Sequence, residues 1–244
     1  MTALLCDTLG DGIAVVLHGS LALGEFRPGQ SDLDVLVVVD EAMTRAQCVA
    51  VATGMSALSG QPSPIELSIV ARRILAAWVH PAPYLYHYSE AWRDRTTHML
   101  ADDATDWFAE RTDPDLTAHV VVARQAGIVL HGAVLLPEVS RAQAFAAVWY
   151  DIATACDDVV NNPVYVILNL CRTIRWLEHG EVLSKSAGGV ALLPELSGDA
   201  QAVVAAVLAV RAGAMVALPH NDVLCAVAGT LLARITAGGL AHRA

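Results

Sequence analysis

The sequence predicts an α+β fold, in which an α/β-type domain with a small mixed sheet is followed by an all-α helical-bundle domain. Two observations support this prediction. Short apolar runs alternate with helical patterns in the first half of the 244 residues, whereas the second half carries only helical patterns rich in alanine, leucine and valine. The proline-bearing segment Leu135–Ser140 marks the junction, so we expect domains at 1–137 and 138–244.

The first domain is expected to alternate strands with helices. Strands are predicted where apolar runs are short and rich in β-branched residues, and helices where apolar residues recur with the helical period. This alternation is typical of a small α/β unit. The predicted strands are 13–18, 34–39 and 65–70, the helical stretches are 20–25, 41–59 and 74–78, and 116–129 is a helix or a partly buried segment.

The second domain is expected to be a bundle of helices at about 141–158, 163–179, 199–218 and 222–237. Asn162 and Pro163 suit the N-cap and the first position of a helix, and Gly180 suits its end. The apolar segment Ala200–Leu218 carries Arg211 near its middle. It therefore predicts a buried helix, since a central arginine would cost at least ~2.5 kcal/mol in a bilayer.

Composition indicates a cytoplasmic protein with no membrane partner. Met1–Asp7 lacks the basic start of a signal peptide and reaches an acid at once. The five cysteines form no Cys-x-x-Cys pair and the nine histidines show no ligand spacing. We therefore expect reduced thiols without a disulfide framework or a zinc site. We also expect a monomer, although the sequence carries no signal for the oligomeric state.

The net charge of −10 disfavours nucleic acid as a partner, because nucleic-acid binding depends on Lys and Arg that neutralise phosphates. It suits a small cationic substrate, which an acidic site attracts, although many proteins are this acidic for solubility alone. The acids expected near the site favour the substrate: Asp32, Asp34, Glu66, Glu90, Asp157 and Asp158.

The segment from His18 to Val39 has the most informative chemistry. Gly19 and Ser20 open a predicted helix, and the free N–H groups of a helix N-terminus bind anions. Asp32 and Asp34 lie two residues apart at the start of an apolar strand, so both side chains point to one face. Mg²⁺ is typically held by one or two carboxylates, phosphate oxygens and water. The segment therefore predicts a site for a nucleoside triphosphate and its metal.

A third acid, Glu66, shares a face of the predicted strand 65–70 with Ser68. With it the chain resembles the polymerase-β-like nucleotidyltransferase superfamily, whose pattern is Gly-Ser, a short helix and loop, Asp-x-Asp and a third acid on a neighbouring strand. The resemblance implies ATP as co-substrate and two Mg²⁺ ions held by Asp32, Asp34 and Glu66. It also implies that Glu66 is the catalytic base. The two roles of Glu66 need opposite pKa shifts, so base, metal ligand or both stay open.

The resemblance extends over nearly the whole chain to the aminoglycoside adenylyltransferases that modify streptomycin and spectinomycin, the 3''/9 type. The segment Tyr88–Trp92 is similar to the one that carries a drug-stacking tryptophan, which here is Trp92. The stretch from Leu168 to Lys185 is similar to a nucleotide-contacting region, which assigns Arg172 and Lys185 to ATP beside Gly19 and Ser20. Lys185 is the only lysine among 15 basic residues, and a compact charge on a flexible stem suits a phosphate.

Streptomycin recognition in those relatives also rests on an aspartate, at a position where this chain has Asn162. The missing charge matters more for streptomycin, with its guanidinium groups, than for spectinomycin. Asp158 resembles a further acidic drug contact, and Tyr165, on the helix face of Arg172, is also assigned to the substrate. The predicted function is transfer of AMP from ATP to a hydroxyl of spectinomycin or streptomycin, which confers antibiotic resistance.

Two other functions stay open. One is a nucleotidyltransferase of the same fold that acts on a protein hydroxyl or another natural product. The other is a non-catalytic nucleotide-binding or antitoxin-like module. The three acids, Ser20 and Lys185 are all present, whereas a decayed site would usually have lost one, and this favours an enzyme.

Overall fold

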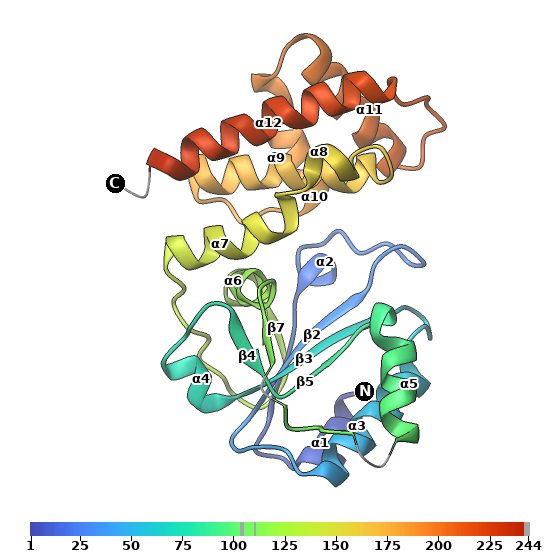
Figure 1. Ribbon diagram of the computed structural model, residues 1–244, viewed down its shortest axis with the longest axis vertical. Helices are drawn as coiled ribbons and strands as arrows, with labels where there is room; N and C mark the ends of the chain where they lie inside the picture. Colours follow the sequence, from blue (N-terminus) through green and yellow to red (C-terminus); the bar gives the residue numbers. More distant parts are fainter. Residues whose placement is uncertain (103–104, 110, 242–244) are drawn as a thin grey trace. The chain divides into compact units, whose positions relative to one another are not determined.

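The computed structural model describes residues 1–102, 105–109 and 111–241. The chain divides into two compact units, Met1–Ala147 and Val148–Ala244. The first unit is built around a sheet, and the described part of the second contains only helices (Figure 1). The predicted α+β class, with a mixed sheet followed by a helical domain, is confirmed. The division lies within α7 (Arg141–Ile152), and the boundary at 137/138 stays a prediction.

The first unit holds a five-stranded mixed sheet in the order β5–β3–β2–β1–β7. Strands β2 and β3 are parallel, and the other neighbours are antiparallel. Its strands are β1 (Ala14–Leu17), β2 (Leu33–Val39), β3 (Ile65–Ala71), β5 (Tyr86–Tyr88) and β7 (Ile128–His131). A two-stranded sheet pairs β4 (Ala82–Tyr84) with β6 (Arg111–Asp113).

The three predicted strands are confirmed as β1, β2 and β3. The other four strands, β4, β5, β6 and β7, were not predicted, because a run of three or four residues is too short for an alternating pattern to be recognised. The predicted segment 116–129 is therefore wrong at its end, where the helix stops at Ala126 and β7 begins at Ile128. Between them a Cβ on Gly127 would lie 2.2 Å from the Ala123 carbonyl oxygen, so only glycine fits this turn.

Helices cover both faces of the sheet. On one face the odd-numbered residues of β2 and β3 pack against α1 and α3, and on the other the even-numbered residues pack against α6 (Figure 1). Because successive side chains of a strand alternate, Asp34 and Glu66 belong to the α6 face. The helices of this unit are α1 (Thr2–Leu9), α2 (Gly19–Ala22), α3 (Arg45–Leu58), α4 (Arg72–Ala76), η1 (Glu90–Trp92), α5 (Arg93–Ala101) and α6 (Leu116–Ala126).

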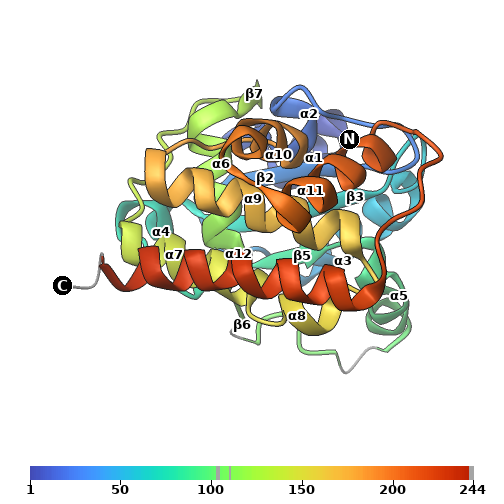
Figure 2. The same cartoon turned by 90° about the horizontal axis from the view of Figure 1, so that it is seen from above.

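In the second unit α9 (Pro163–His179) packs against the other long helices (Figure 2). Both ends of α9 were predicted, and Gly180 ends it with a left-handed φ of 71°. The predicted helix 141–158 is instead α7 followed by a separate α8, and 199–218 stops at Arg211. The remaining helices are α8 (Ala155–Asp158), α10 (Lys185–Leu192), η2 (Leu193–Glu195), α11 (Gly198–Arg211) and α12 (Asn221–Ala241).

Helix α10, which begins at Lys185, was not among the predicted helices. Its glycines lower helix propensity and so hide the helix in the sequence, yet they are needed for packing. A Cβ on Gly188 would lie 2.6 Å from the Cα of Arg172, so α10 approaches α9 more closely than any side chain would allow. Ser184 caps the helix by accepting a hydrogen bond from the Ala187 N–H at 3.2 Å.

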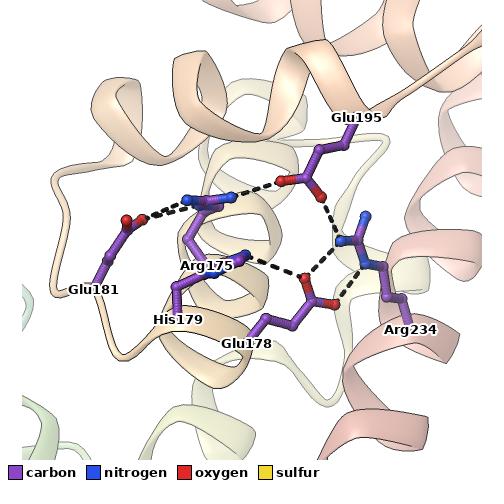
Figure 3. Close-up of polar contacts among 6 residues, drawn as sticks. All are labelled: Arg175, Glu178, His179, Glu181, Glu195 and Arg234. Atoms are coloured by element: carbon purple, nitrogen blue, oxygen red, sulfur yellow. Dashed lines mark hydrogen bonds and ion pairs between the residues drawn. The ribbon is translucent and has the colours of Figure 1, made fainter.

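An ion-pair network joins three helical segments of the second unit (Figure 3). Arg234 of α12 contacts Glu178 of α9 and Glu195 of η2, each at 2.6 Å. Arg175 of α9 contacts Glu195 at 2.6 Å and Glu181 at 2.9 Å. Opposite charges alternate throughout the network, which therefore fastens α12 and η2 to α9. None of the described helices combines the length and the hydropathy that crossing a bilayer requires.

Candidate active site

Asp34 and Glu66 are direct partners in the parallel pairing of β2 with β3. Both point to the α6 face, as does Ser68, which follows Glu66 by two residues. Asp32 immediately precedes β2, and its charge, like that of Asp34, acts on Glu66. The structure therefore brings the three predicted acids together at one end of two central strands.

Gly19 lies against this acidic cluster. Its φ is 61°, and a Cβ added to it would lie 1.8 Å from Oδ2 of Asp34, so no other residue fits here. The N–H of His18 donates to the carbonyl oxygen of Asp34 at 2.9 Å and ties the Gly19 turn to the strand. The hydroxyl of Ser20 is shielded from solvent and makes no hydrogen bond within the described residues. A buried hydroxyl without a partner is costly, which suits a group that meets a ligand.

His119 and Asp115 complete the cluster, and the sequence analysis missed both. His119 Nε2 lies 3.2 Å from Oδ2 of Asp115 and 4.0 Å from Oε1 of Glu66. The ring of His18 lies 5.2 Å from that of His119, centroid to centroid. The sequence holds one weak signal, the helical spacing of four between Asp115 and His119, but only the packing of α6 on β3 places them beside Glu66.

The electrostatics of the cluster follow from burial and crowding. Burial raises the pKa of Glu66 to about 7, with His119 opposing and Asp34, Asp115 and Asp32 adding to the rise. Burial opposes protonation of His119, but the surrounding carboxylates, Asp115 first, raise its pKa to about 10. Burial and the charge of His119 lower the pKa of His18 to about 3. Near neutral pH the cluster therefore holds a charged His119, a neutral His18 and a Glu66 close to its titration midpoint.

The donors at this point of the fold fit a hard divalent cation. All three carboxylates offer oxygen, the ligand that Mg²⁺ prefers. Burial first, and then repulsion by Asp34 and Asp32, raise the pKa of Glu66, and a bound cation would offset that repulsion. The close approach of Gly19 to Asp34 leaves the carboxylate beside the turn that carries the unpartnered Ser20 hydroxyl. Asp32, Asp34 and Glu66 could thus hold Mg²⁺ next to a phosphate-binding turn.

A chain of contacts links the acidic face of β3 to Trp92. Oγ of Ser68 lies 3.1 Å from Nδ1 of His87, whose ring packs edge-on against Trp92 with centroids 4.9 Å apart. Burial lowers the pKa of His87 to about 4, so this link is neutral at physiological pH. Arg95 sits over the Trp92 ring at 4.1 Å from its centroid, a cation–π contact. Trp92 therefore offers an aromatic surface that already attracts a guanidinium.

Three of the predicted nucleotide and substrate residues of the second unit, Tyr165, Arg172 and Lys185, lie in one group of contacts. The hydroxyl of Tyr165 donates to Oδ1 of Asp151 at 3.0 Å, and Lys185 Nζ lies 4.6 Å from the centroid of the Tyr165 ring. Asn169 donates to Asp151 and accepts from Nε of Arg172. Asp151 and Asn169 thus orient Tyr165 and Arg172, a role that the sequence analysis did not assign.

Asp158 and Asn162 are exposed at the end of α8 and the start of α9. Asn162 stands at the N-cap as predicted, but its side chain makes no capping hydrogen bond. Oδ2 of Asp158 accepts from the Thr154 hydroxyl at 2.6 Å. Glu90, counted among the acids expected near the site, is engaged by Arg93 at 2.8 Å, and that hydrogen bonding lowers its pKa to about 2.

Two family models match the chain. The model described as nucleotidyltransferase domain matches residues 4–72, which contain Gly19, Ser20 and the three acids. The model described as aminoglycoside adenylyltransferase, C-terminal domain, matches residues 134–230, which contain Arg172 and Lys185. Among solved structures, the chain is similar to the crystal structure of spectinomycin adenyltransferase AAD(9) from Enterococcus faecialis with ATP and spectinomycin. The TM-score is 0.79 at 20% identity, over 96% of each chain, which shows a shared fold.

Proposed function

Because the chain is a member of the aminoglycoside adenylyltransferase family, we propose that it transfers AMP from ATP to a hydroxyl of spectinomycin. The observation that carries the proposal is the meeting of Asp32, Asp34 and Glu66 on one face of β2 and β3, against the Gly19 turn. The similar AAD(9) was crystallised with ATP and spectinomycin, which supports this pair of substrates. A transfer of this kind would inactivate the drug and so confer resistance.

In this proposal Asp32, Asp34 and Glu66 hold Mg²⁺, which when bound supplies positive charge to the phosphates of ATP. Gly19 and Ser20 bind the phosphates, because the glycine lets the turn lie directly against Asp34 and the Ser20 hydroxyl has no partner within the described residues. Arg172 and Lys185 are the proposed nucleotide contacts of the second unit. A guanidinium and an ammonium both suit phosphate oxygens.

We assign the general base to Glu66. A base works best when its pKa lies near the working pH. Burial raises the pKa of Glu66 to about 7, and Mg²⁺ beside the carboxylate would act in the opposite direction and lower it. The proton of the attacking drug hydroxyl passes to Glu66 while the hydroxyl oxygen attacks the α-phosphate and pyrophosphate leaves. His119 lies 4.0 Å from the Glu66 carboxylate. Its positive charge favours the ionised carboxylate and so keeps the pKa of Glu66 from rising further.

The acceptor is proposed to stack on Trp92, with Asp158, Asn162 and Tyr165 as its polar contacts. Trp92 already holds the guanidinium of Arg95, which supports a cationic partner at this ring. Asn162 carries no charge, and this favours spectinomycin over streptomycin, whose guanidinium groups gain most from a carboxylate.

The test is release of pyrophosphate by the purified protein with ATP and Mg²⁺, comparing spectinomycin, streptomycin and no added acceptor. We expect release that depends on spectinomycin and is slower with streptomycin. ATP binding without release for either drug would contradict the proposed acceptor and point to a protein hydroxyl or another natural product. ATP binding that persists with every acceptor tried, always without turnover, would favour the non-catalytic alternative.

A further inference from the structure

Three side chains that the proposed reaction does not use come together on the first unit. They are Cys6 on α1, Asp11 in the turn after α1, and His131 at the end of β7. One donor atom of each lies within 4.8 Å of those of the other two. A thiol, a carboxylate and an imidazole thus converge from segments that are far apart in the sequence.

Backbone features hold the three residues close. Helix α1 ends at Gly10, whose φ is 89° and whose N–H donates to the Cys6 carbonyl at 2.8 Å, so the chain turns back toward Cys6. On β7, His131 pairs with Val15, and the next residue, Gly132, has a φ of 68°. A Cβ on Gly132 would lie 2.2 Å from the carbonyl oxygen of Ile13, so the two segments approach more closely than any other residue would allow.

A hydrogen bond prepares His131 for a metal. Nε2 of its ring lies 3.2 Å from the carbonyl oxygen of Asp11. When Nε2 carries the proton and donates it there, Nδ1 keeps the lone pair that a metal needs. Histidines that bind metals almost always donate their other ring N–H in this way, often to a backbone carbonyl.

The donor set selects the class of ion. Thiolate, imidazole and carboxylate together suit Zn²⁺ and neighbouring borderline ions, whereas Mg²⁺ takes oxygen ligands. Tetrahedral zinc places its ligand atoms roughly 3.5 Å apart, so donors within 4.8 Å of one another need to close by about 1 Å. Cys6 and His131 are half-buried and Asp11 is exposed, which leaves the side chains room to move.

We propose that Cys6, Asp11 and His131 form a three-ligand site for Zn²⁺ or a similar borderline ion, with the fourth position open to water. The site joins α1 and its turn to the edge strand β7, so the bound ion stabilises the first unit. The sequence predicted no zinc site because the spacing of its cysteines and histidines carries no signal; Cys6 and His131 meet only through the pairing of β7 with β1.

The test uses Co²⁺ as a spectroscopic probe on the metal-free protein, with excess Mg²⁺ present to occupy the carboxylates of the acidic cluster. We expect a thiolate-to-cobalt charge-transfer band and tetrahedral d–d bands that saturate at one ion per chain and disappear when Zn²⁺ is added. Cys6→Ser should abolish the charge-transfer band. His131→Ala and Asp11→Asn should weaken binding by at least about tenfold, since even outer-shell partners change metal affinity by about 10–100-fold.

Two matched variants control for general effects. Cys225→Ser changes another half-buried cysteine, and Asp7→Asn changes an exposed acid on α1 outside the cluster, so neither should alter the bands. Far-UV circular dichroism checks that each variant folds. The absence of a thiolate band in the wild-type protein, or a band that survives Cys6→Ser, would overturn the proposal. Both readouts are independent of pyrophosphate release.

Discussion

The two charged clusters of the molecule are built in opposite ways. In the first unit like charges crowd around Glu66, and burial together with Asp34, Asp115 and Asp32 raises the pKa of its carboxyl to about 7. In the second unit opposite charges alternate, and the hydrogen bond from Arg234 lowers the pKa of Glu195. Hydrogen bonding to Glu178 and Glu195 likewise raises the pKa of Arg234.

This difference distinguishes the acidic cluster around Glu66, which has the charge pattern of a ligand-binding site, from the ion-pair network, whose charges balance one another. Each charge of the Arg175–Arg234 network has its counterion within the unit, so the network has no need of a further partner (Figure 3). Asp34, Asp115 and Asp32 disfavour the charge on Glu66, whose carboxyl therefore gains from a nearby cation or from a proton. Perturbed carboxylates of this kind mark functional sites more often than balanced networks do.

Apart from a change to the acids themselves, the largest loss of activity is expected for Gly19→Ala, which disturbs the acidic cluster. Its Cβ would collide with Asp34, so either the turn or the carboxylate must move. A displacement of about 1 Å at a reacting site can cost about 100-fold in rate, and we expect a loss of that size in spectinomycin-dependent pyrophosphate release. Gly24→Ala is the matched control, because Gly24 has a φ of 72° but no atom within 4 Å of an added Cβ.

Backbone strain should cost each glycine variant about 1 kcal/mol of stability, because alanine is strained at a positive φ, and the collision with Asp34 should add to the loss in Gly19→Ala. Chemical denaturation measures this loss separately from the rate. Equal loss of activity in the two variants would show that backbone strain, and not the contact with Asp34, is responsible.

A second effect concerns pH. In the folded chain Glu66 keeps its proton up to about pH 7, whereas the ordinary value is 4.5. Between these values the folded state binds the extra proton, so the free energy of unfolding falls as pH rises. Glutamine does not titrate, so Glu66→Gln should not show this fall. Its free energy of unfolding relative to wild type should therefore rise with pH from 4.5 to 7, by up to about 3 kcal/mol.

Urea unfolding in EDTA at pH 4.5, 5.5 and 6.5 measures this gain. The range ends at pH 6.5 because above that value His119 also begins to contribute, and the loss of its proton lowers the free energy of unfolding in the same direction as that of Glu66. The pKa of His119 is raised to about 10, so its stabilisation is complete below 6.5 and is lost as the pH rises through 10. A difference between variant and wild type that does not change with pH would mean that Glu66 titrates normally.

A smaller effect is expected in the ion-pair network. Arg234 contacts two glutamates, and its side chain is 32% exposed. Partly exposed pairs contribute about 0.2–1 kcal/mol each, so Arg234→Gln should lower the free energy of unfolding by about 1 kcal/mol and leave turnover unchanged. Arg73→Gln, at an exposed arginine of α4, is the control. A large loss of turnover in Arg234→Gln would contradict the view that the ion-pair network is structural and only the acidic cluster is catalytic.

The smallest effect is expected for Asn162→Asp. The side chain is exposed, so a new carboxylate gains only a screened attraction for a guanidinium, about 0.2–1 kcal/mol. Streptomycin turnover should therefore improve by up to about fivefold, with little change for spectinomycin. Steady-state kinetics with both drugs measures this effect. An equal change for both drugs would show that Asn162 does not determine the selectivity against streptomycin.

The parts of the site that the sequence predicted depend on local geometry. A strand period of two places Asp32 with Asp34, and Glu66 with Ser68, on one face of each segment, and the Gly-Ser pair of the predicted phosphate turn is visible without a structure. The same is true of α9, whose apolar face and terminal residues mark both of its ends.

The parts that the sequence missed depend on tertiary packing. His119 reaches Glu66 only because α6 lies on the even-numbered face of the sheet. Asp151 was not recognised because its partners Tyr165 and Asn169 lie on another helix. Helix α10 was hidden because its packing against α9 requires glycine, which local propensity opposes.

The most direct test of the central claim is spectinomycin-dependent pyrophosphate release by Glu66→Gln, with ATP binding followed by calorimetry. If the acids of the first unit form the active site and Glu66 is its base, the rate should fall by about 100- to 10,000-fold while Mg²⁺-dependent ATP binding persists. A rate within a few fold of wild type would contradict the account, because the like-charge cluster would then have no catalytic role.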